Sequence, residues 1–458
     1  MTVDVTAAPD VLDLTCETLI VGAGAGGLIA ALAAHETGQS VLVVEADVVP
    51  SGSTALSAGL VPAAGTKAQA SEGIDDDAGL FASDIQTKAK HQNEQQLVEL
   101  LTQNAGPAID WLSEKYHLPF SVITNFDYPG HSRRRMHGLP TRSGAELIDA
   151  LRSTCEDSEI DIICERRATR LFYENGKIQG IAVTRPDGGT ETIGCEKLIL
   201  ACNGFGGNRD LVQRFLPDIE SGLWFGHDGN RGEALLWGQA IGAELNHLGA
   251  YQGHGNVAHP HGILITWAVI TQGGIQVNRG GSRFWNEAQG YSEAARAVLA
   301  QPEGIAFTIF DGRIASIARQ FEDFKQAEAV GAIKVSETLE GLAQDLGLPV
   351  EPFLQTMAAL PASGKDEFDR EFASQKLSAP FCGVRVTGAL FHTQGGLRTD
   401  DDARVYRTDG TVFPNLHACG GAACGVSGQS DSGYLSGNGL LSAVVLGRLA
   451  GQSVRHRL

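Results

Sequence analysis

The sequence predicts an α/β protein with a Rossmann-type dinucleotide-binding unit near its N-terminus. An apolar strand is expected over residues 17–21 (ETLIV), followed by a glycine-rich turn at residues 22–27 (GAGAGG). A helix of small residues (LIAALAAHETG) then leads into a second apolar strand at residues 40–46 (SVLVVEA). Strand, turn, helix and strand fall within about 30 residues, which is the length of one such unit.

Each part of this unit has a physical reason to contact a dinucleotide. Gly22 permits the tight turn, Gly24 lets a pyrophosphate approach the backbone, and Gly27 lets the helix pack on the strand. The N-terminus of the helix favours the negative charge of a phosphate. Glu45 closes the second strand, where an acid accepts hydrogen bonds from the 2′-hydroxyl of a ribose.

The overall composition sets bounds on size, charge and location. The chain has 458 residues, of which 43% are hydrophobic, and this predicts a multi-lobed globular protein. The formal charge of −19 is spread without a basic block, which argues against binding to nucleic acid or to an anionic membrane. No signal peptide and no apolar run of about 18 residues is present, so a cytoplasmic protein is expected.

The metal-ligating residue types show no ligand pattern. The eight cysteines form no CxxC, haem or zinc spacing, and are interpreted as reduced core residues. His254, His259 and His261 lie close together, but no acid or cysteine stands at ligand spacing beside them. We therefore expect no metal.

Later segments favour a flavin over a nicotinamide dinucleotide. Residues 51–60 (SGSTALSAGL) offer hydroxyls and glycines for a second phosphate-binding loop, which a nicotinamide site does not need. Strands are expected over residues 177–183 and 191–201, the second ending at CNGFGGN. Near the C-terminus another strand enters glycine turns (TVFPNLHACGGAACGVSG), and GYLSGNGLL begins a helix.

Taken together, these segments resemble the fumarate reductase and succinate dehydrogenase flavoprotein superfamily. That superfamily includes soluble flavocytochrome-type fumarate reductases, 3-ketosteroid dehydrogenases and 4-oxocyclohexanecarboxylate desaturases. The resemblance covers nearly the whole chain, and its further markers are ACNGFGGN, NRGGSRFWNE and FHTQGGL.

The resemblance implies a discontinuous, glutathione reductase-like FAD-binding domain with an inserted α+β capping domain. The FAD-binding domain is expected over residues 1–225 and 350–458, with a helical excursion at 65–160, and the capping domain over 226–349. The implied cofactor-binding residues are Gly22, Gly24, Gly26, Gly27, Glu45, Ala46, Ser51, Gly52, Ser53, Thr54, Ala58, Gly59, Ala168, Ala201, Asn203, Gly204, Gly420, Gly421, Asn438, Gly439 and Leu440.

Two departures from the family concern the flavin. Some members bond FAD covalently to a histidine where this chain has Ser53, so noncovalent FAD is expected. A Gly-Glu pair usual in the family is replaced by Gly420 and Gly421, and Ser427 or a main-chain group is expected to take the place of the missing acid. The helix that begins near Asn438 is expected to direct backbone N–H groups toward the pyrimidine edge of the flavin.

The largest departure concerns the substrate. In the fumarate reductases that the chain resembles, one arginine delivers a proton to the substrate and another clamps a carboxylate. This chain has Tyr291 and Tyr434 at those positions. Because a phenol cannot replace the bidentate recognition of a carboxylate by guanidinium, fumarate and succinate become poor candidates. His254 and His392, by contrast, match histidines that hydrogen-bond the substrate carboxylate.

A pair of phenols indicates ketone chemistry. In the 3-ketosteroid dehydrogenases, a tyrosine at the position of Tyr434 and a nearby backbone N–H polarise a ketone, while a second tyrosine takes the α-proton. The resemblance implies that Tyr291 is this base. Without the family pattern, Tyr291 would be interpreted as a packing residue at the start of a helix.

The base must be ionised, and an ordinary phenol at pH 7 loses its proton at a cost of about 4 kcal/mol. Candidates for reducing that cost are Tyr128 in NFDYPG and Arg135 or His137 in SRRRMHG, on a loop that reaches the active site in related dehydrogenases. Tyr128 is therefore counted among the catalytic candidates. The arginine run at 133–135 is otherwise interpreted as a solvated or salt-bridged loop.

The sequence therefore predicts an FAD-dependent desaturase acting beside the ketone of a small cyclic keto acid, such as 4-oxocyclohexanecarboxylate. Two alternatives stay open: a reductase or dehydrogenase of an unsaturated or polycarboxylic acid, and a flavin subunit that transfers electrons to a partner. The electron acceptor, whether oxygen, a quinone or a dye-like carrier, is left open by the sequence.

Overall fold

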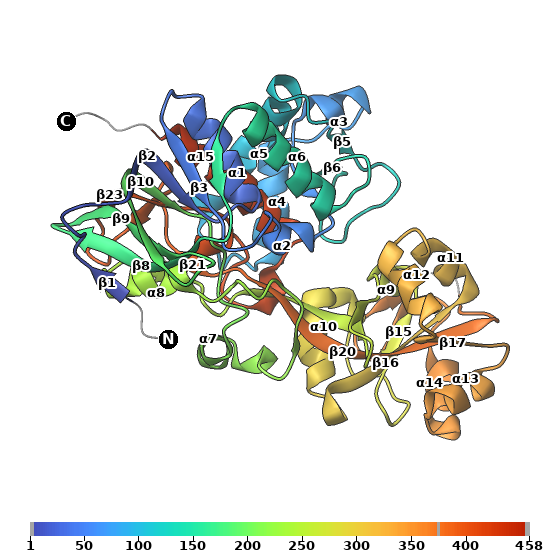
Figure 1. The fold of residues 1–458 in the computed structure, drawn as a ribbon. Coiled ribbons are helices and arrows are strands. Elements are labelled where there is room, and N and C mark those ends of the chain that lie inside the picture. Colours follow the sequence, from blue (N-terminus) through green and yellow to red (C-terminus); the bar gives the residue numbers. More distant parts are fainter. Residues whose placement is uncertain (1–3, 373–375, 454–458) are drawn as a thin grey trace. The chain divides into compact units, whose positions relative to one another are not determined.

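The N-terminal segment forms the predicted strand, turn and helix. Strand β2 (Leu14–Val21) runs parallel to β3 (Val41–Val44), and helix α1 (Ala25–His35) connects them. Every residue of α1 from Ala25 to Ala34 is buried. The predicted α/β class with a βαβ unit is confirmed, and Figure 1 shows α1 beside the long C-terminal helix α15 (Asn438–Gln452).

The computed structural model describes residues 4–372 and 376–453. The chain divides into two units. The first comprises Met1–Phe215, Gly226–Tyr251 and His392–Leu458, and the second comprises Leu216–Phe225 and Gln252–Phe391.

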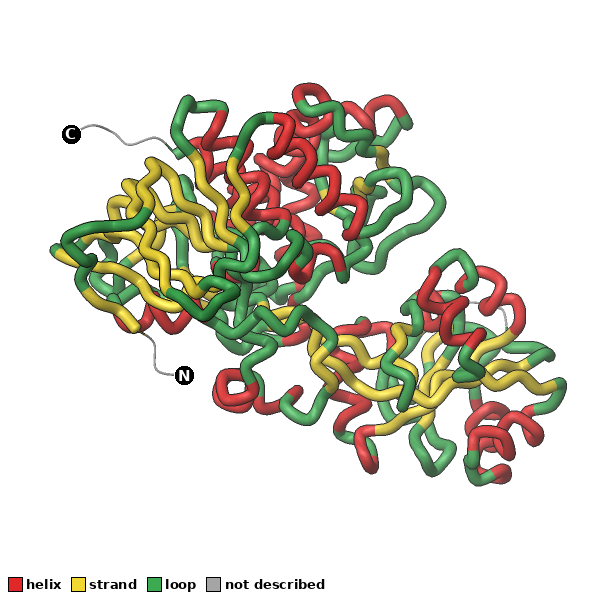
Figure 2. The backbone as a smooth tube through the Cα atoms, in the orientation of Figure 1, coloured by secondary structure: helices red, strands yellow, loops and turns green. Residues whose placement is uncertain are grey.

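The first unit contains a nine-stranded sheet in the order β1-β8-β9-β10-β2-β3-β7, with β23 joined to β10 and β22 joined to β23. Its strands appear in yellow in Figure 2. Strands β2, β10 and β23 are parallel neighbours, so their carboxyl ends meet at one edge. The other strands are β1 (Asp4–Thr6), β7 (Asp161–Ile163), β8 (Arg167–Glu174), β9 (Lys177–Thr184), β10 (Thr190–Leu200), β22 (Arg404–Tyr406) and β23 (Val412–Ala418).

Helices and two small sheets complete the first unit. The expected excursion at 65–160 is largely helical, and also contributes to a three-stranded sheet in the order β4-β6-β5. The helices are α2 (Gly52–Ala55), α3 (Lys67–Ser71), α4 (Ala78–Lys88), α5 (Gln95–Lys115), α6 (Gly144–Asp157), α7 (Arg209–Phe215) and α8 (Glu233–Ala240). The short strands are β4 (Val61–Pro62), β5 (Ser121–Val122), β6 (Met136–Gly138), β12 (Leu245–Asn246) and β21 (Gly396–Leu397).

The second unit is built on a seven-stranded sheet in the order β14-β13-β20-β16-β15, with β11 and β17 joined to β20. Its strands are β11 (Leu223–Trp224), β13 (Tyr251–Ala258), β14 (Ile263–Leu264), β15 (Ile275–Val277), β16 (Ile305–Asp311), β17 (Ile333–Ser336) and β20 (Phe381–Thr393), with a separate pair β18 (Gly364–Lys365) and β19 (Glu371–Phe372). Its helices are α9 (Ala268–Thr271), α10 (Tyr291–Leu299), α11 (Gly312–Ala318), α12 (Glu322–Ala329), α13 (Leu339–Leu346) and α14 (Val350–Ala359).

The division differs from the expected boundaries of 226 and 349. Residues 226–251 belong to the first unit, and residues 350–391 belong to the second. The reason is β20, whose 13 residues form the centre of the second sheet and end in the first unit. The expected boundary at 349 thus assigns β20 to the first unit, although β20 lies between β13 and β16 in the second sheet.

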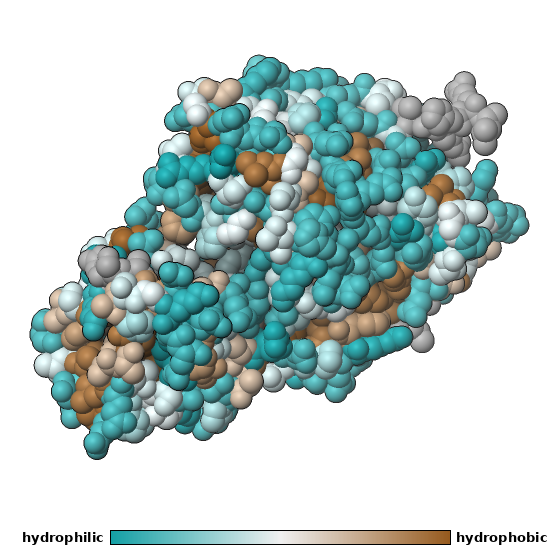
Figure 3. Space-filling model, turned by 180° about the vertical axis from the view of Figure 1, so that it is seen from behind, coloured by the Kyte–Doolittle hydropathy of each residue, from teal (hydrophilic) through white to brown (hydrophobic). Residues whose placement is uncertain are grey.

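The surface is described by its hydropathy on one face and by the character of the helices. The face seen in Figure 3 is mostly hydrophilic, with hydrophobic residues in scattered patches. Among the described residues, no helix has the length and apolar character needed to cross a membrane.

Candidate active site

The glycine loop between β2 and α1 is shaped by a positive φ angle and by one close approach of the backbone. Gly22 has φ +105°, a conformation that favours glycine, and a Cβ placed on Gly27 would lie 1.9 Å from the carbonyl oxygen of Gly22. The N-cap of α1 is Gly24, which supplies no side-chain hydrogen bond, and no acidic residue lies in the first turn. The N-terminus of α1 is therefore suited to a phosphate.

Glu45 lies directly after β3 and is fastened to the same loop. Its carboxylate accepts the N–H of Ala23 at 2.7 Å and the N–H of Asp47 at 2.9 Å, and only 8% of the residue is exposed. Each carboxylate oxygen has a second lone pair with which it can accept a hydrogen bond from a ribose hydroxyl.

The second predicted phosphate loop contains α2 and is joined to the end of β10. The Ser53 Oγ accepts hydrogen bonds from the Nδ2 atoms of Asn203 and Asn230, both at 2.9 Å. These bonds use both acceptor sites of the hydroxyl, so its hydrogen is directed to an acceptor such as phosphate. Asn203 has φ +65°, a conformation seldom adopted by residues other than glycine and concentrated at functional sites.

All the predicted cofactor-binding residues lie in the first unit. The residues described above supply a helix N-terminus, an acid for the ribose and an oriented hydroxyl, and this donor set fits FAD. Asn230, which the sequence reasoning missed, belongs to this set through Ser53. Its only sequence signal is its place in a glycine-rich segment, GHDGNRG.

Tyr434 precedes α15 and is buried in the first unit, with 7% of the residue exposed. Burial raises the pKa of Tyr434 to about 12, although hydrogen bonds with the backbone of Gly439 and Gly437 act in the opposite direction. The phenol is therefore protonated at neutral pH, and it can donate a hydrogen bond.

His392 lies at the end of β20, in the first unit. Its Nδ1 lies 2.7 Å from the Nε2 of Gln394, and burial lowers the pKa of His392 to about 4. The imidazole is neutral at pH 7. Ser427, expected to stand in for the missing acid, is hydrogen-bonded to Gln394 and Asn438.

Tyr128 also lies in the first unit, where it packs edge-on against Phe126 beside Leu60 and Met136. Burial raises the pKa of Tyr128 to about 12. Tyr128 lines a pocket of about 440 Å³ together with His131 and neighbouring loop residues. Its phenol is thus a hydrogen-bond donor at neutral pH.

The two other candidates for assisting Tyr291 have structural partners within the first unit. Arg135 is fully buried and pairs with Asp76 at 2.9 Å and with Asp84 at 2.5 Å. Of the two interpretations given for the arginine run, solvated or salt-bridged, the second describes Arg135. The Nε2 of His137 lies 2.8 Å from the hydroxyl of Thr66, and burial lowers the pKa of His137 to about 4.

Tyr291 is the first residue of α10, in the second unit. Its ring stacks on His254 with centroids 5.1 Å apart and planes 20° apart, and it meets Trp267 edge-on at 6.4 Å. His254 in turn stacks on Phe391 at 5.4 Å. The structure thus brings Tyr291 and His254 together in an aromatic cluster, of which the sequence reasoning missed Trp267 and Phe391.

His254 is neutral within this cluster. Burial lowers the pKa of His254 to about 3, and the backbone N–H of Asn256 donates to its Nδ1 at 3.2 Å. Because Nδ1 accepts, the single proton of the neutral ring lies on Nε2.

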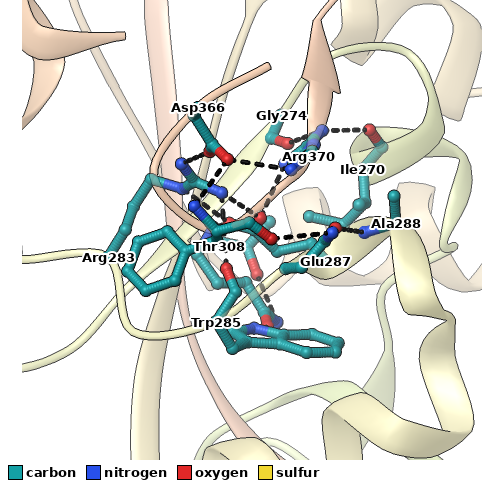
Figure 4. Close-up of polar contacts among 12 residues, drawn as sticks. Ile270, Gly274, Arg283, Trp285, Glu287, Ala288, Thr308, Asp366 and Arg370 are labelled. Atoms are coloured by element: carbon teal, nitrogen blue, oxygen red, sulfur yellow. Dashed lines mark hydrogen bonds and ion pairs between the residues drawn. The ribbon is translucent and has the colours of Figure 1, made fainter.

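The turn that precedes α10 is held by buried charges (Figure 4). The Glu287 carboxylate pairs with Arg283 at 2.6 Å and with Arg370 at 3.0 Å, and it also accepts the N–H of Gln276 at 2.8 Å. Asp366 forms a second ion pair with Arg283, and each of the four charged side chains is at most 6% exposed. Arg370 and Asp366 were missed because nothing local in the sequence links them to the NRGGSRFWNE turn.

Comparison with known proteins identifies the family. A family described as FAD binding domain matches residues 17–440. The chain belongs to the FAD-binding family of fumarate reductase and succinate dehydrogenase flavoproteins. The predicted FAD cofactor and flavoprotein fold are confirmed, and the protein is an FAD-dependent oxidoreductase acting on C=C or C–C bonds.

Individual relatives show where the chain lies within this family. A probable fumarate reductase of Shewanella frigidimarina is 29% identical over 97% of this chain and 76% of that protein. The open conformation of a flavocytochrome c3 fumarate reductase superposes with a TM-score of 0.82 and 27% identity, covering 96% of this chain and 78% of that one. A 3-ketosteroid-Δ4-(5α)-dehydrogenase from Rhodococcus jostii superposes with a TM-score of 0.79 at 22% identity, covering 98% of this chain and 99% of that one, and shows the shared fold.

Proposed function

We propose that the protein desaturates a small cyclic keto acid, such as 4-oxocyclohexanecarboxylate, between the carbons α and β to the ketone. The observation that carries this proposal is the pair Tyr291 and Tyr434, at positions where the fumarate reductases that the chain resembles have arginines. Without those cations, a dicarboxylate loses its strongest partners.

The surroundings of the candidate residues support a neutral oxygen as the recognised group. His254 and His392 have pKa values near 3 and 4, so neither carries a positive charge at pH 7. Tyr434 remains a phenol and can donate to a ketone oxygen. A ketone needs hydrogen-bond donors at its oxygen, whereas a pair of carboxylates needs cations.

In the proposed reaction, Tyr434 and the backbone N–H near Asn438 hold the ketone oxygen as negative charge develops on it. Ionised Tyr291 removes the proton from the α-carbon, and the electron pair of that bond forms the new double bond. Bound FAD supplies a two-electron acceptor for the hydride that leaves the β-carbon. The product is an α,β-unsaturated ketone, and the reduced enzyme returns its electrons to an acceptor.

Two half-reactions, reduction of the flavin by a ketone and its reoxidation by an unsaturated acid, distinguish this proposal from the reduction of an unsaturated acid. The oxidised protein is mixed anaerobically with 4-oxocyclohexanecarboxylate, and the chemically reduced protein is mixed with fumarate or urocanate. We expect the ketone to bleach the flavin and the unsaturated acids to leave the reduced flavin unchanged. If the flavin is not bleached by this compound or by other cyclic ketones, the proposal is wrong.

One observation favours a second candidate. The similar protein of Shewanella frigidimarina is named a probable fumarate reductase, and this name suggests that the chain reduces an unsaturated acid. Reoxidation of the reduced flavin by fumarate or urocanate would support this alternative and would assign Tyr291 to proton donation rather than proton removal.

A further inference from the structure

His392 lies at the end of a chain of buried hydrogen bonds in the first unit. The Nδ2 of Asn438 donates to the Ser427 Oγ at 3.0 Å, and this hydroxyl donates to the Oε1 of Gln394 at 2.9 Å. The Nε2 of Gln394 then lies 2.7 Å from the Nδ1 of His392. Asn438, Ser427 and Gln394 are at most 3% exposed, so water does not compete with these bonds.

The direction of these hydrogen bonds determines which nitrogen of the His392 imidazole carries the proton. A hydroxyl has only one hydrogen, and Ser427 uses it toward Gln394, so the carbonyl oxygen of that side chain is the acceptor. The amide nitrogen therefore faces the imidazole as a donor, and the Nδ1 of His392 accepts. In a neutral ring whose Nδ1 accepts, the proton lies on Nε2.

Gly421 leaves the space that this arrangement requires. A Cβ on residue 421 would lie 2.9 Å from the Nε2 of His392 and 2.1 Å from the Oδ1 of Asn203. An acidic residue at position 421 would bring a carboxylate beside the imidazole, and that charge would favour the protonated form of the ring. The glycine therefore both admits the ring and removes a charge that would protonate it.

We propose that Gln394 is a positioning residue that holds His392 as a neutral Nε2–H donor and thereby selects a carbonyl oxygen on the substrate. The proposal deepens the desaturase function and rests on it for the identity of the substrate. A neutral imidazole can stabilise an enolate-like oxygen by donating a hydrogen bond without transferring its proton. A charged imidazole in the same place would instead favour a carboxylate.

Nitrogen NMR of the FAD-loaded protein, labelled with ¹⁵N in its 13 histidines, tests the tautomer directly and without substrate. The His392 signals are assigned by their loss in His392→Gln. At pH 7 we expect an unprotonated Nδ1 and a protonated Nε2. A protonated Nδ1 in the wild-type protein would overturn the proposal, whether or not any ketone is a substrate.

The variant Gln394→Glu reverses the polarity of the contact, because a carboxylate accepts a hydrogen bond and cannot donate one. We expect Nδ1 to become protonated and the ring to titrate between about pH 5 and 8. Turnover of the cyclic ketone should fall at least about tenfold and gain a pH inflection in that range, with FAD affinity unchanged. Unchanged histidine signals or an unchanged pH profile would contradict the assignment.

Two further variants distinguish a specific change in the His392 tautomer from a nonspecific effect of the substitution. Gln103→Glu adds the same charge on an exposed residue of α5, and it should change neither the histidine signals nor the pH profile. Gln394→Met removes the amide without adding a charge, and we expect a mixture of both His392 tautomers. A pure Nε2–H tautomer in Gln394→Met would show that Gln394 does not position the ring.

Discussion

Of the predicted catalytic residues, the first unit holds Tyr434, His392 and Tyr128 and the second holds Tyr291 and His254, and the two sets are held in different ways. In the first unit, Tyr434 is hydrogen-bonded to the backbone at the start of α15, and His392 ends a chain of polar side chains. In the second unit, Tyr291 and His254 stack on each other and on further aromatic rings. Hydrogen bonds hold Tyr434 and His392, whereas ring stacking orients Tyr291 and His254.

The two environments suit different tasks. A phenol whose pKa is raised to about 12, like that of Tyr434, is a reliable hydrogen-bond donor to a developing oxyanion. A phenol in an aromatic cluster, like that of Tyr291, has its ring oriented by its neighbours His254 and Trp267. The proposed division of roles between oxygen holder and base follows this contrast.

Replacing Tyr291 with phenylalanine is expected to have the largest effect. The ring stacking on His254 is retained and only the hydroxyl is lost, so turnover should fall about 1,000-fold while the fold is kept. The measurement is the rate of anaerobic flavin reduction by the cyclic ketone. Tyr173→Phe, in β8 of the first unit, is the matched control and should change the rate less than about twofold. A loss below about tenfold in Tyr291→Phe would make Tyr291 a packing residue.

Arg370→Met tests the buried charges that hold the turn before Tyr291. Without Arg370, the buried carboxylates of Glu287 and Asp366 share the single cation of Arg283, so one buried negative charge is uncompensated. We expect a loss of about 3–5 kcal/mol in the free energy of unfolding. Denaturant titration of the holoprotein measures it. Arg319→Met breaks an exposed pair with Glu328 and should cost less than about 1 kcal/mol. Equal losses in the two variants would show that the buried network has no special role.

The glycine loop and the buried ion pairs illustrate what the sequence can and cannot predict. The glycine loop was predictable because close approaches such as that of Gly27 to Gly22 are made within one short segment. Arg370 was not, because it meets Glu287 only after 82 intervening residues fold into the second unit. The two units differ from the expected boundary at 349 for the same reason, since β20 joins its sheet through pairing that no local pattern reveals.

Tyr434→Phe tests the proposed role of the tyrosine in the first unit. It removes one donor to the developing oxyanion, so turnover should fall about 100-fold, less than for loss of the base, because the backbone donor remains. FAD affinity, measured by release of flavin fluorescence, should be unchanged. If Tyr434→Phe instead raises KM alone, the hydroxyl serves ground-state binding rather than the reaction.

The smallest expected effect concerns acid stability. The pKa values of His254 and His392 lie near 3 and 4 in the folded protein, below the ordinary value of about 6.5 in the unfolded chain. At any pH between the folded and the unfolded pKa, the unfolded state therefore binds more protons than the folded state. The folded protein loses stability as the pH falls below about 6.5. Thermal unfolding at pH 7 and pH 5 should show a smaller acid-induced drop in His254→Gln and His392→Gln than in the wild type. Equal drops would mean that these histidines are not buried in their neutral form.

We propose that the protein recognises and activates a ketone. The most direct measurement compares anaerobic flavin reduction by 4-oxocyclohexanecarboxylate with that by cyclohexanecarboxylate, which keeps the ring and the carboxylate but lacks the ketone oxygen. We predict rapid bleaching by the keto acid and none by the acid without a ketone. Equal rates with both compounds, or reduction by succinate in place of the keto acid, would contradict the account.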